Sequence, residues 1–285
     1  MPERRAPSVR ARQLAAELRR LRDAALLTGE EAAAKLSWSP SKISRIETAQ
    51  TSTSLADLRR LLDAYEVTGT QRERLEILGQ SAGQRGWWDA YADTLGPEYA
   101  ALIALEAEAA VIRWYAPMLV PGLLQTERYA RQVIQSGLVV APPGEVERRV
   151  QVKLARQRIL TRDDPPRLQV ILDEATLLRD VGSTELMREQ LERLLSAATL
   201  PSVQLHLLPF AAGAHPATAG EFTILSFPEL VAPDVVYLEN MTSDLYVERE
   251  GEVYRYNLAF DRLLTLALNP DESAAAIALR AANIK

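Results

Sequence analysis

The sequence predicts an α+β protein with two domains: an all-α domain of five helices over residues 1–82, and an α+β domain with a mostly antiparallel sheet over residues 83–285. Three observations predict this fold class. A chain of 285 residues, of which 47% are hydrophobic, is long enough to bury two cores. Apolar residues recur at helical spacing up to Ala82, whereas apolar runs typical of strands first appear at Leu168. Between the two patterns, Gly83-Gln84-Arg85-Gly86 has the composition of a linker.

Five helices are expected in the first domain because helix-start signals recur at short intervals. The predicted helices begin near Ser8, Thr28, Ser39, Ser54 and Thr70. Thr28 and Thr70 each precede a glutamate by three residues, which is the pattern of a capping box. Ser39 is followed by a proline, which is favoured at the first helical position because an N–H group there has no partner within the helix. Short helices joined by short turns predict a compact bundle.

The second and third helices have the spacing of a helix-turn-helix. Ala33 falls where the two helices must approach closely, and only a small side chain fits there. The short turn Ser37-Trp38 holds the helices at a steep angle, so the helix over residues 39–48 can enter the major groove of DNA. An ordinary pair of core helices is the alternative for the apolar positions alone. The exposed positions of residues 39–48 are small, polar and basic, and this indicates DNA binding; we expect Trp38 to serve packing.

Candidate DNA contacts follow from the geometry of the third helix. Ser39 and the free N–H groups of the first turn suit a phosphate. Ser41 and Arg45 are four residues apart, so they share a face and can reach base edges. Lys42 and Ser44 flank this face and suit either role. Three more candidates for contact with the DNA backbone lie at the start of the fourth helix: Thr51, Thr53 and Ser54.

Residues 28–62 resemble the helix-turn-helix of the XRE family, the Cro/repressor-like regulators. In that family an arginine of the first helix pairs with a glutamate near the end of the recognition helix, and Arg22 and Glu47 match those positions. The resemblance therefore implies a structural ion pair between these two residues. One departure is Gly29, because the family usually has a glutamine there that commonly touches the DNA backbone. The chain lacks that contact.

Beyond residue 82 the sequence predicts helices first and strands later. A helix is expected over residues 97–114, followed by a bent connector over residues 115–122. Further helices are expected over residues 125–136, 145–161, 184–198, 252–266 and 271–282. Strands are expected over residues 168–172, 203–208, 222–227, 235–238 and 245–248. Helices followed by a sheet with helices around it are typical of the α+β class.

Several phrases at fixed spacing resemble the C-terminal domain of WhiJ-like regulators, which are abundant in actinobacteria. The phrases are Arg85-Gly86-Trp87-Trp88, Leu105-Glu106-Ala107-Glu108-Ala109, Val120-Pro121-Gly122-Leu123-Leu124-Gln125-Thr126, Leu207-Leu208-Pro209-Phe210 and Gly213-Ala214-His215-Pro216. With Trp38-Ser39-Pro40-Ser41-Lys42 in the first domain, the resemblance covers residues 8–280. It implies transcriptional control in developmental or antitoxin-like settings, often beside a gene for a short partner protein. The C-terminal domain of those regulators is of unknown function.

The charge of the chain is uneven. Residues 1–75 carry a net charge of +4 and the remainder carries −9, against −5 for the whole chain. A basic module joined to an acidic remainder suits a protein whose first domain meets a polyanion. We therefore expect a transcription regulator, acting as a repressor, whose partner is double-stranded DNA.

One helix-turn-helix reads only a few base pairs, so we expect a homodimer that reads two half-sites. The second domain is the expected site of dimerisation, of docking for a small partner protein encoded nearby, or of both. The alternative is a regulator that senses a small molecule in an effector pocket of the second domain. The aromatic residues Trp87, Trp88, Trp114 and Tyr115 suit each of these roles and equally suit a plain core.

An enzymatic second domain is a further alternative. His215 lies in an expected loop, and four carboxylates fall near it at predicted strand ends: Asp173, Glu174, Glu221 and Glu239. A histidine with a carboxylate is the minimal acid–base pair. The sequence has no Gly-rich phosphate loop and no G-x-S-x-G motif, so we expect no enzyme. Zero cysteines and two histidines exclude thiolate, iron–sulfur and three-histidine sites, so we expect no metal and no cofactor.

The sequence contains no run of 18 or more uncharged apolar residues, so no transmembrane helix is expected. The first 25 residues are rich in arginine and lack an apolar segment followed by a small-residue cleavage site, which argues against secretion. We therefore expect a cytoplasmic protein, associated with the nucleoid, with no membrane partner.

Overall fold

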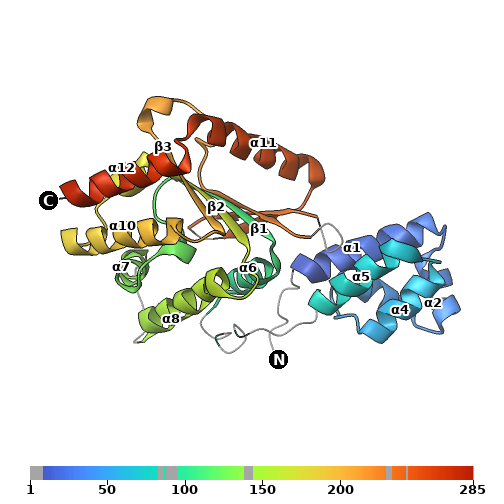
Figure 1. The fold of residues 1–285 in the computed structure, drawn as a ribbon. Coiled ribbons are helices and arrows are strands. Elements are labelled where there is room, and N and C mark those ends of the chain that lie inside the picture. Colours follow the sequence, from blue (N-terminus) through green and yellow to red (C-terminus); the bar gives the residue numbers. More distant parts are fainter. Residues whose placement is uncertain are drawn as a thin grey trace. The chain divides into compact units, whose positions relative to one another are not determined.

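The computed structural model describes residues 9–82, 87, 91, 95–137, 144–228, 233–241 and 243–284. The chain divides into two compact units, Met1–Asp89 with Pro228–Ala232 and Ala90–Phe227 with Pro233–Lys285. The expected N-cap Ser8, the expected linker over residues 83–86 and Trp88 lie outside the described residues. Figure 1 shows the helices and strands of both units.

The described part of the first unit contains five helices (Figure 1): α1 (Val9–Ala24), α2 (Gly29–Leu36), α3 (Pro40–Glu47), α4 (Leu55–Ala64) and α5 (Gly69–Ala82). Thr28 forms a full capping box with Glu31 at the start of α2, while Ser39 caps α3 and Ser54 caps α4. These three predicted start signals are confirmed. The expected cap at Thr70 is wrong, because α5 begins at Gly69 and Thr70 therefore lies inside the first turn.

The turn between α2 and α3 sets the position of α3. Ser37 ends α2 in the left-handed region (φ 55°), a conformation that reverses the chain direction sharply after a helix. The N–H group of Trp38 donates to the Ala33 carbonyl oxygen at 2.8 Å and closes this turn. Ala33 is 1% exposed and Ile43 of α3 is equally buried, so the two helices pack closely through the small side chain. The expected helix-turn-helix geometry follows from these contacts.

The described part of the second unit contains helices around one sheet. Its helices are α6 (Pro97–Glu108), α7 (Glu127–Gly137), α8 (Glu145–Gln157), α9 (Glu174–Leu178), α10 (Thr184–Ala198), α11 (Glu250–Leu266) and α12 (Pro270–Asn283). Its 3-10 helices are η2 (Gly122–Leu124), η3 (Arg158–Thr161) and η4 (Phe210–Ala212). Its strands are β1 (Val111–Ala116), β2 (Arg167–Asp173), β3 (Val203–Leu208), β4 (Phe222–Ser226), β5 (Val235–Glu239) and β6 (Asp244–Val247).

The six strands form one mixed sheet in the order β3-β2-β1-β4-β5-β6. β1, β2 and β3 pair in parallel, whereas the pairings of β1 with β4, β4 with β5 and β5 with β6 are antiparallel. Figure 1 shows α11 on one side of this sheet and α8 on the other. The buried residues Phe222, Phe260 and Leu263 belong to the core between the sheet and α11. The expected α+β class is confirmed.

One predicted element of the second unit is wrong. The helix expected over residues 97–114 ends at Glu108, and Val111–Ala116 forms the strand β1 between β2 and β4. A central strand that is covered on both faces has a continuous apolar run, which periodicity does not distinguish from a buried helix. Trp114 and Tyr115, on successive positions of β1, are 6% and 2% exposed and serve the two cores of the sheet. The short helix α9 was also missed.

A buried ion pair joins α6 and α8. Arg156 donates two hydrogen bonds to the carboxylate of Glu106, and the two side chains are 4% and 1% exposed. Arg156 Nη1 also donates to Tyr99 Oη at 2.8 Å, and the guanidinium carbon lies 5.6 Å from the centroid of the Trp114 ring. Each nitrogen of the guanidinium therefore has a partner, as a buried charge requires.

None of the helices in the described ranges combines the length and the apolar character needed to cross a membrane.

Candidate nucleic-acid interface

α3 presents one polar face to solvent. Ser41, Ser44 and Arg45 are exposed, whereas Ile43 and Ile46 are 1% and 3% exposed. Ser41 and Arg45 are one helical turn apart, so their side chains leave the helix on the same side. Arg45 has no hydrogen-bond or ion-pair partner for its side chain among the residues that the structure describes. An uncommitted guanidinium on an exposed helix face is free to donate to guanine O6 and N7.

The first turn of α3 places two hydroxyl groups side by side. Ser39 Oγ accepts a hydrogen bond from the Lys42 N–H group at 3.3 Å and lies 3.1 Å from Ser41 Oγ. Both serines are exposed. The N-terminus of a helix carries a partial positive charge, and a hydroxyl of this pair can donate outward. This turn is therefore suited to a phosphate oxygen.

Arg22 of α1 and Glu47 of α3 form a two-point ion pair. Arg22 Nε lies 2.8 Å from Glu47 Oε1, Arg22 Nη2 lies 3.0 Å from Glu47 Oε2, and the side chains are 12% and 8% exposed. Arg22 Nη1 also donates to the Leu27 carbonyl oxygen at 2.6 Å. The hydrogen bonds that Arg22 donates to Glu47 raise the pKa of Arg22. The pair fixes the last turn of α3 against α1, although burial offsets much of its net contribution to stability.

Lys42, a candidate DNA contact, points toward the start of α4 in the free protein. Its Nζ lies 3.0 Å from both carboxylate oxygens of Asp57 and 3.6 Å from the centroid of the Trp38 ring. Arg60 approaches the same ring at 4.9 Å and donates to the Leu36 carbonyl oxygen at 2.6 Å. Trp38 is therefore a packing residue between two cations, as expected. Sequence reasoning missed this cluster, although Trp38 and Lys42 are only four residues apart in the sequence.

Lys42→Ala is expected to lower stability by about 1 kcal/mol, because the ion pair and the cation–π contact are both partly exposed. Because its charge is paired with Asp57, Lys42→Ala should weaken DNA binding only slightly, and Asp57→Ala, which removes a negative charge, should not weaken it. Urea unfolding and titration of a fluorescent DNA duplex measure both quantities. A loss of affinity in Lys42→Ala alone, with a weaker dependence on salt, would instead assign Lys42 to a DNA phosphate.

The remaining candidates lie in the segment between α3 and α4. Ser54 Oγ accepts from the Asp57 N–H group at 3.0 Å, so this hydroxyl caps α4. The Thr51 N–H group donates to the Arg45 carbonyl oxygen at 3.3 Å, which holds the segment against the end of α3. Thr51 and Ser54 are exposed and Thr53 is half-buried. Thr51 thus lies at the carboxyl end of α3, whereas Ser54 lies at the start of α4, toward which Lys42 points.

Comparison with known families matches two separate parts of the chain. Residues 13–75 match a family described as a helix-turn-helix domain, and all the candidate DNA contacts lie inside this segment. Residues 99–278, more than half of the chain, match a family described as a domain of unknown function (DUF5753). The chain belongs to the DUF5753 family. These matches confirm the expected combination of an XRE-like helix-turn-helix and a C-terminal domain of unknown function. Neither curated proteins nor solved structures give a match.

The DUF5753 domain gathers three polar side chains at the carboxyl edge of its parallel strands. Tyr115 Oη lies 3.4 Å from Asp173 Oδ2 and 3.4 Å from His215 Nε2. Asp173 is the last residue of β2, and its other carboxylate oxygen caps α9 by accepting from the Ala175 N–H group at 2.9 Å. Burial, and then the charge of Asp173, raise the pKa of Tyr115. His215 and Asp173, one of the four carboxylates expected near it, thus both contact Tyr115.

The other carboxylates expected near His215 have different partners. Glu174 accepts from the Phe210 N–H group at 2.7 Å, and Glu221 accepts from Trp114 Nε1 at 2.6 Å. Burial raises the pKa of Glu221 to about 7. Glu239 is exposed at the end of β5. No group of three metal-ligating side chains occurs among the described residues.

Proposed function

We propose that the protein is a sequence-specific DNA-binding regulator of transcription that reads the major groove with α3. The helix-turn-helix match indicates DNA binding. The main support for sequence-specific reading is the exposed Arg45. Its side chain lacks a partner within the described residues and lies one helical turn from Ser41. The Arg22–Glu47 pair supports this proposal because it holds the reading helix rigidly against α1.

Selection from a random pool of DNA duplexes tests this function directly. The full chain is expected to enrich a motif with two related half-sites whose centres lie about one helical turn, or 34 Å, apart. The enriched duplex should bind at least about a thousandfold more tightly than an unrelated duplex at the same salt concentration. Equal affinity for selected and unrelated duplexes would overturn sequence-specific recognition.

We further propose that the protein represses transcription, acting in the cytoplasm on the nucleoid. Repression needs only a bound protein that blocks RNA polymerase, whereas activation needs an additional contact with the polymerase. In vitro transcription from a promoter that overlaps the selected motif should fall as protein is added. A rise in transcript would contradict repression.

For the DUF5753 domain we propose that it holds two copies of the chain together. Two half-sites require two copies of α3. The domain offers three exposed apolar side chains in the segments that directly follow β1, β2 and β3: Met118 (48% exposed), Leu178 at the end of α9 (44%) and Phe210 at the start of η4 (58%). Parallel strands end at one edge of a sheet, so these side chains belong to the same edge, and apolar residues gathered there favour contact with protein. A small partner protein is the other candidate occupant of this edge. Light scattering would then show a monomer of the chain alone and a larger complex with the partner.

A second candidate is a regulator whose DUF5753 domain responds to a small molecule. Tyr115, Asp173 and His215 lie at the carboxyl edge of the parallel strands, where open α/β sheets bind ligands. A thermal-shift screen against metabolites tests this candidate, because a true ligand raises Tm with its concentration. A ligand of this edge should stabilise the wild type and not His215→Ala; equal shifts would place it elsewhere.

A further inference from the structure

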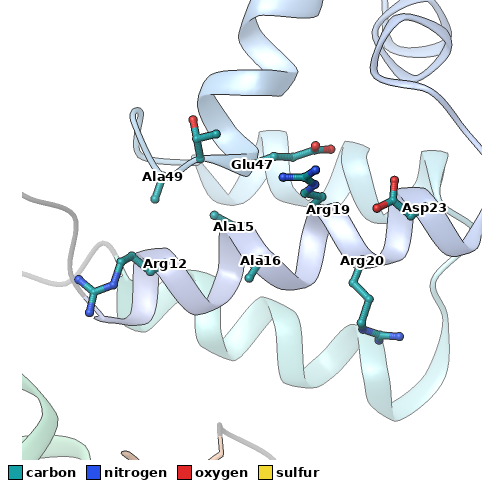
Figure 2. A pocket seen from close by; sticks show the side chains of 9 residues that line it. Arg12, Ala15, Ala16, Arg19, Arg20, Asp23, Glu47 and Ala49 are labelled. Carbon is teal, nitrogen blue, oxygen red and sulfur yellow. The ribbon is translucent and has the colours of Figure 1, made fainter. Parts of the chain in front are cut away.

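The first unit contains an open groove between α1 and the end of α3 (Figure 2). Its volume is about 430 Å³. One wall is α1, with Arg12, Ala15, Ala16, Arg19, Arg20 and Asp23, and the other is formed by Glu47, Thr48 and Ala49. The two alanines leave room at the floor of the groove. None of the candidate DNA contacts derived from the sequence lies in it.

Some charged side chains of this groove have ion-pair partners among the described residues, and one does not. Glu47 is held by two nitrogens of Arg22, and Asp23 lies 2.8 Å from Arg22 Nη1. Arg20 is held by Glu17, with nitrogen–oxygen distances of 2.8 and 2.5 Å. Arg19, by contrast, is exposed and has neither a hydrogen bond nor an ion pair with the described residues. Both carboxylates of the groove are thus paired with Arg22, while the Arg19 side chain is paired with neither and remains available to an anion.

The end of α3 is prepared for an anion in a second way. The last carbonyl groups of a helix carry a partial negative charge, which repels anions. Here the Ser44 and Ile46 carbonyl oxygens accept from the Thr48 and Ala49 N–H groups, and the Arg45 carbonyl oxygen accepts from those of Gln50 and Thr51. These hydrogen bonds cover the negative end of α3. Figure 2 shows Arg19 on the side of α1 that faces Glu47 and Ala49, and Arg20 on the other side.

We propose that this groove holds a phosphodiester of the DNA backbone, with Arg19 as its principal ligand. The proposal rests on the proposed function, because a duplex read by Arg45 passes the carboxyl end of the same helix. Phosphate contacts outside the reading face fix the position of a protein on DNA without reading sequence. The groove is open and more than large enough for a phosphate group with its sugar, and its uncommitted charge has the complementary sign.

A duplex of arbitrary sequence tests the proposal, because a phosphate contact does not depend on sequence. One lost contact should lower the slope of log K against log salt concentration by about 0.9, which corresponds to about eightfold weaker binding at 0.1 M salt. Arg19→Ala of the full chain is expected to show both changes, and Arg19→Lys, which keeps the charge, is expected to restore most of the slope. Arg20→Ala is the matched control, since it removes the same charge from a side chain that lines the groove but is held by Glu17 and points to the other side of α1 (Figure 2).

The outcomes distinguish a failure of DNA binding itself from a failure of the proposed phosphate contact in the groove. If the wild type fails to bind any duplex, the proposed function itself is wrong. If the wild type binds, and Arg19→Ala and Arg20→Ala show the same slope and affinity, the groove does not hold a phosphate. Arg19→Ala should keep the melting temperature of the wild type, because its side chain has no partner among the described residues. A selective loss of slope in Arg19→Ala at unchanged Tm supports the groove.

Discussion

Arg156→Ala is expected to destabilise the DUF5753 domain by about 3–5 kcal/mol. The substitution leaves the Glu106 carboxylate, which is 1% exposed, without its counter-charge. It also removes the hydrogen bond that Arg156 donates to Tyr99 Oη. An isolated charge in such a site is far more costly than the pair itself is favourable. Equilibrium urea unfolding of the full chain measures this loss as a lower midpoint.

Two variants make the Arg156 prediction specific. Arg128→Ala breaks another Arg–Glu pair, with Glu189 at 3.1 Å, but those side chains are 57% and 40% exposed. That variant should lose less than about 1 kcal/mol. Replacing both members of the buried pair, in Arg156→Met with Glu106→Leu, should recover a large part of the stability because no buried charge remains. A double variant as unstable as Arg156→Ala would show that packing, not the orphaned charge, dominates.

Truncation after Ala82 is expected to weaken binding to the two-half-site operator by about 10²- to 10⁴-fold. The five helices have their own core, so the fragment should fold, but without the DUF5753 domain it should be monomeric. Each half-site then binds separately, and the gain from linking two reading helices is lost. Light scattering and DNA titration of the full chain and the fragment measure the two effects.

Fusion of the fragment to a two-stranded coiled coil is the matched control for this truncation. A coiled coil joins two copies without supplying any other property of the DUF5753 domain. The fused fragment should therefore recover much of the lost affinity, while binding a single half-site no better than the plain fragment. A full chain that is monomeric, or a fragment with full affinity, would remove the second domain from the account of DNA binding.

The first unit could be predicted from the sequence because its signals are local. Caps at Thr28, Ser39 and Ser54 depend on residues three positions apart, and helical spacing of apolar residues shows the buried side. Strand β1 could not be predicted in the same way. Five of its six residues are apolar, so its sequence does not distinguish a strand from a buried helix, and the tertiary pairing with β2 and β4 decides the conformation.

In the candidate site, too, features that depend on nearby residues could be predicted, and contacts between distant elements could not. The exposed face of Ser41 and Arg45 follows from spacing on one helix, and the Arg22–Glu47 pair was inferred from family resemblance. The commitment of Lys42 to Asp57 could not be predicted, because it depends on where α4 lies relative to α3. The pair of Arg156 with Glu106, fifty residues apart, has no signal in a single sequence. Side-chain partners that come from other elements are visible only in the fold.

The affinity of Arg45→Ala for the selected operator and for its single-base variants tests the central claim most directly. If Arg45 reads a base through its free guanidinium, the substitution should cost about 1–3 kcal/mol and abolish discrimination at one base pair in each half-site. Discrimination at all other positions should remain, as should the affinity for duplexes of unrelated sequence apart from a small electrostatic loss. An Arg45→Ala protein that keeps the wild-type affinity and the wild-type preference at every base pair would contradict the assignment of α3 as the reading helix.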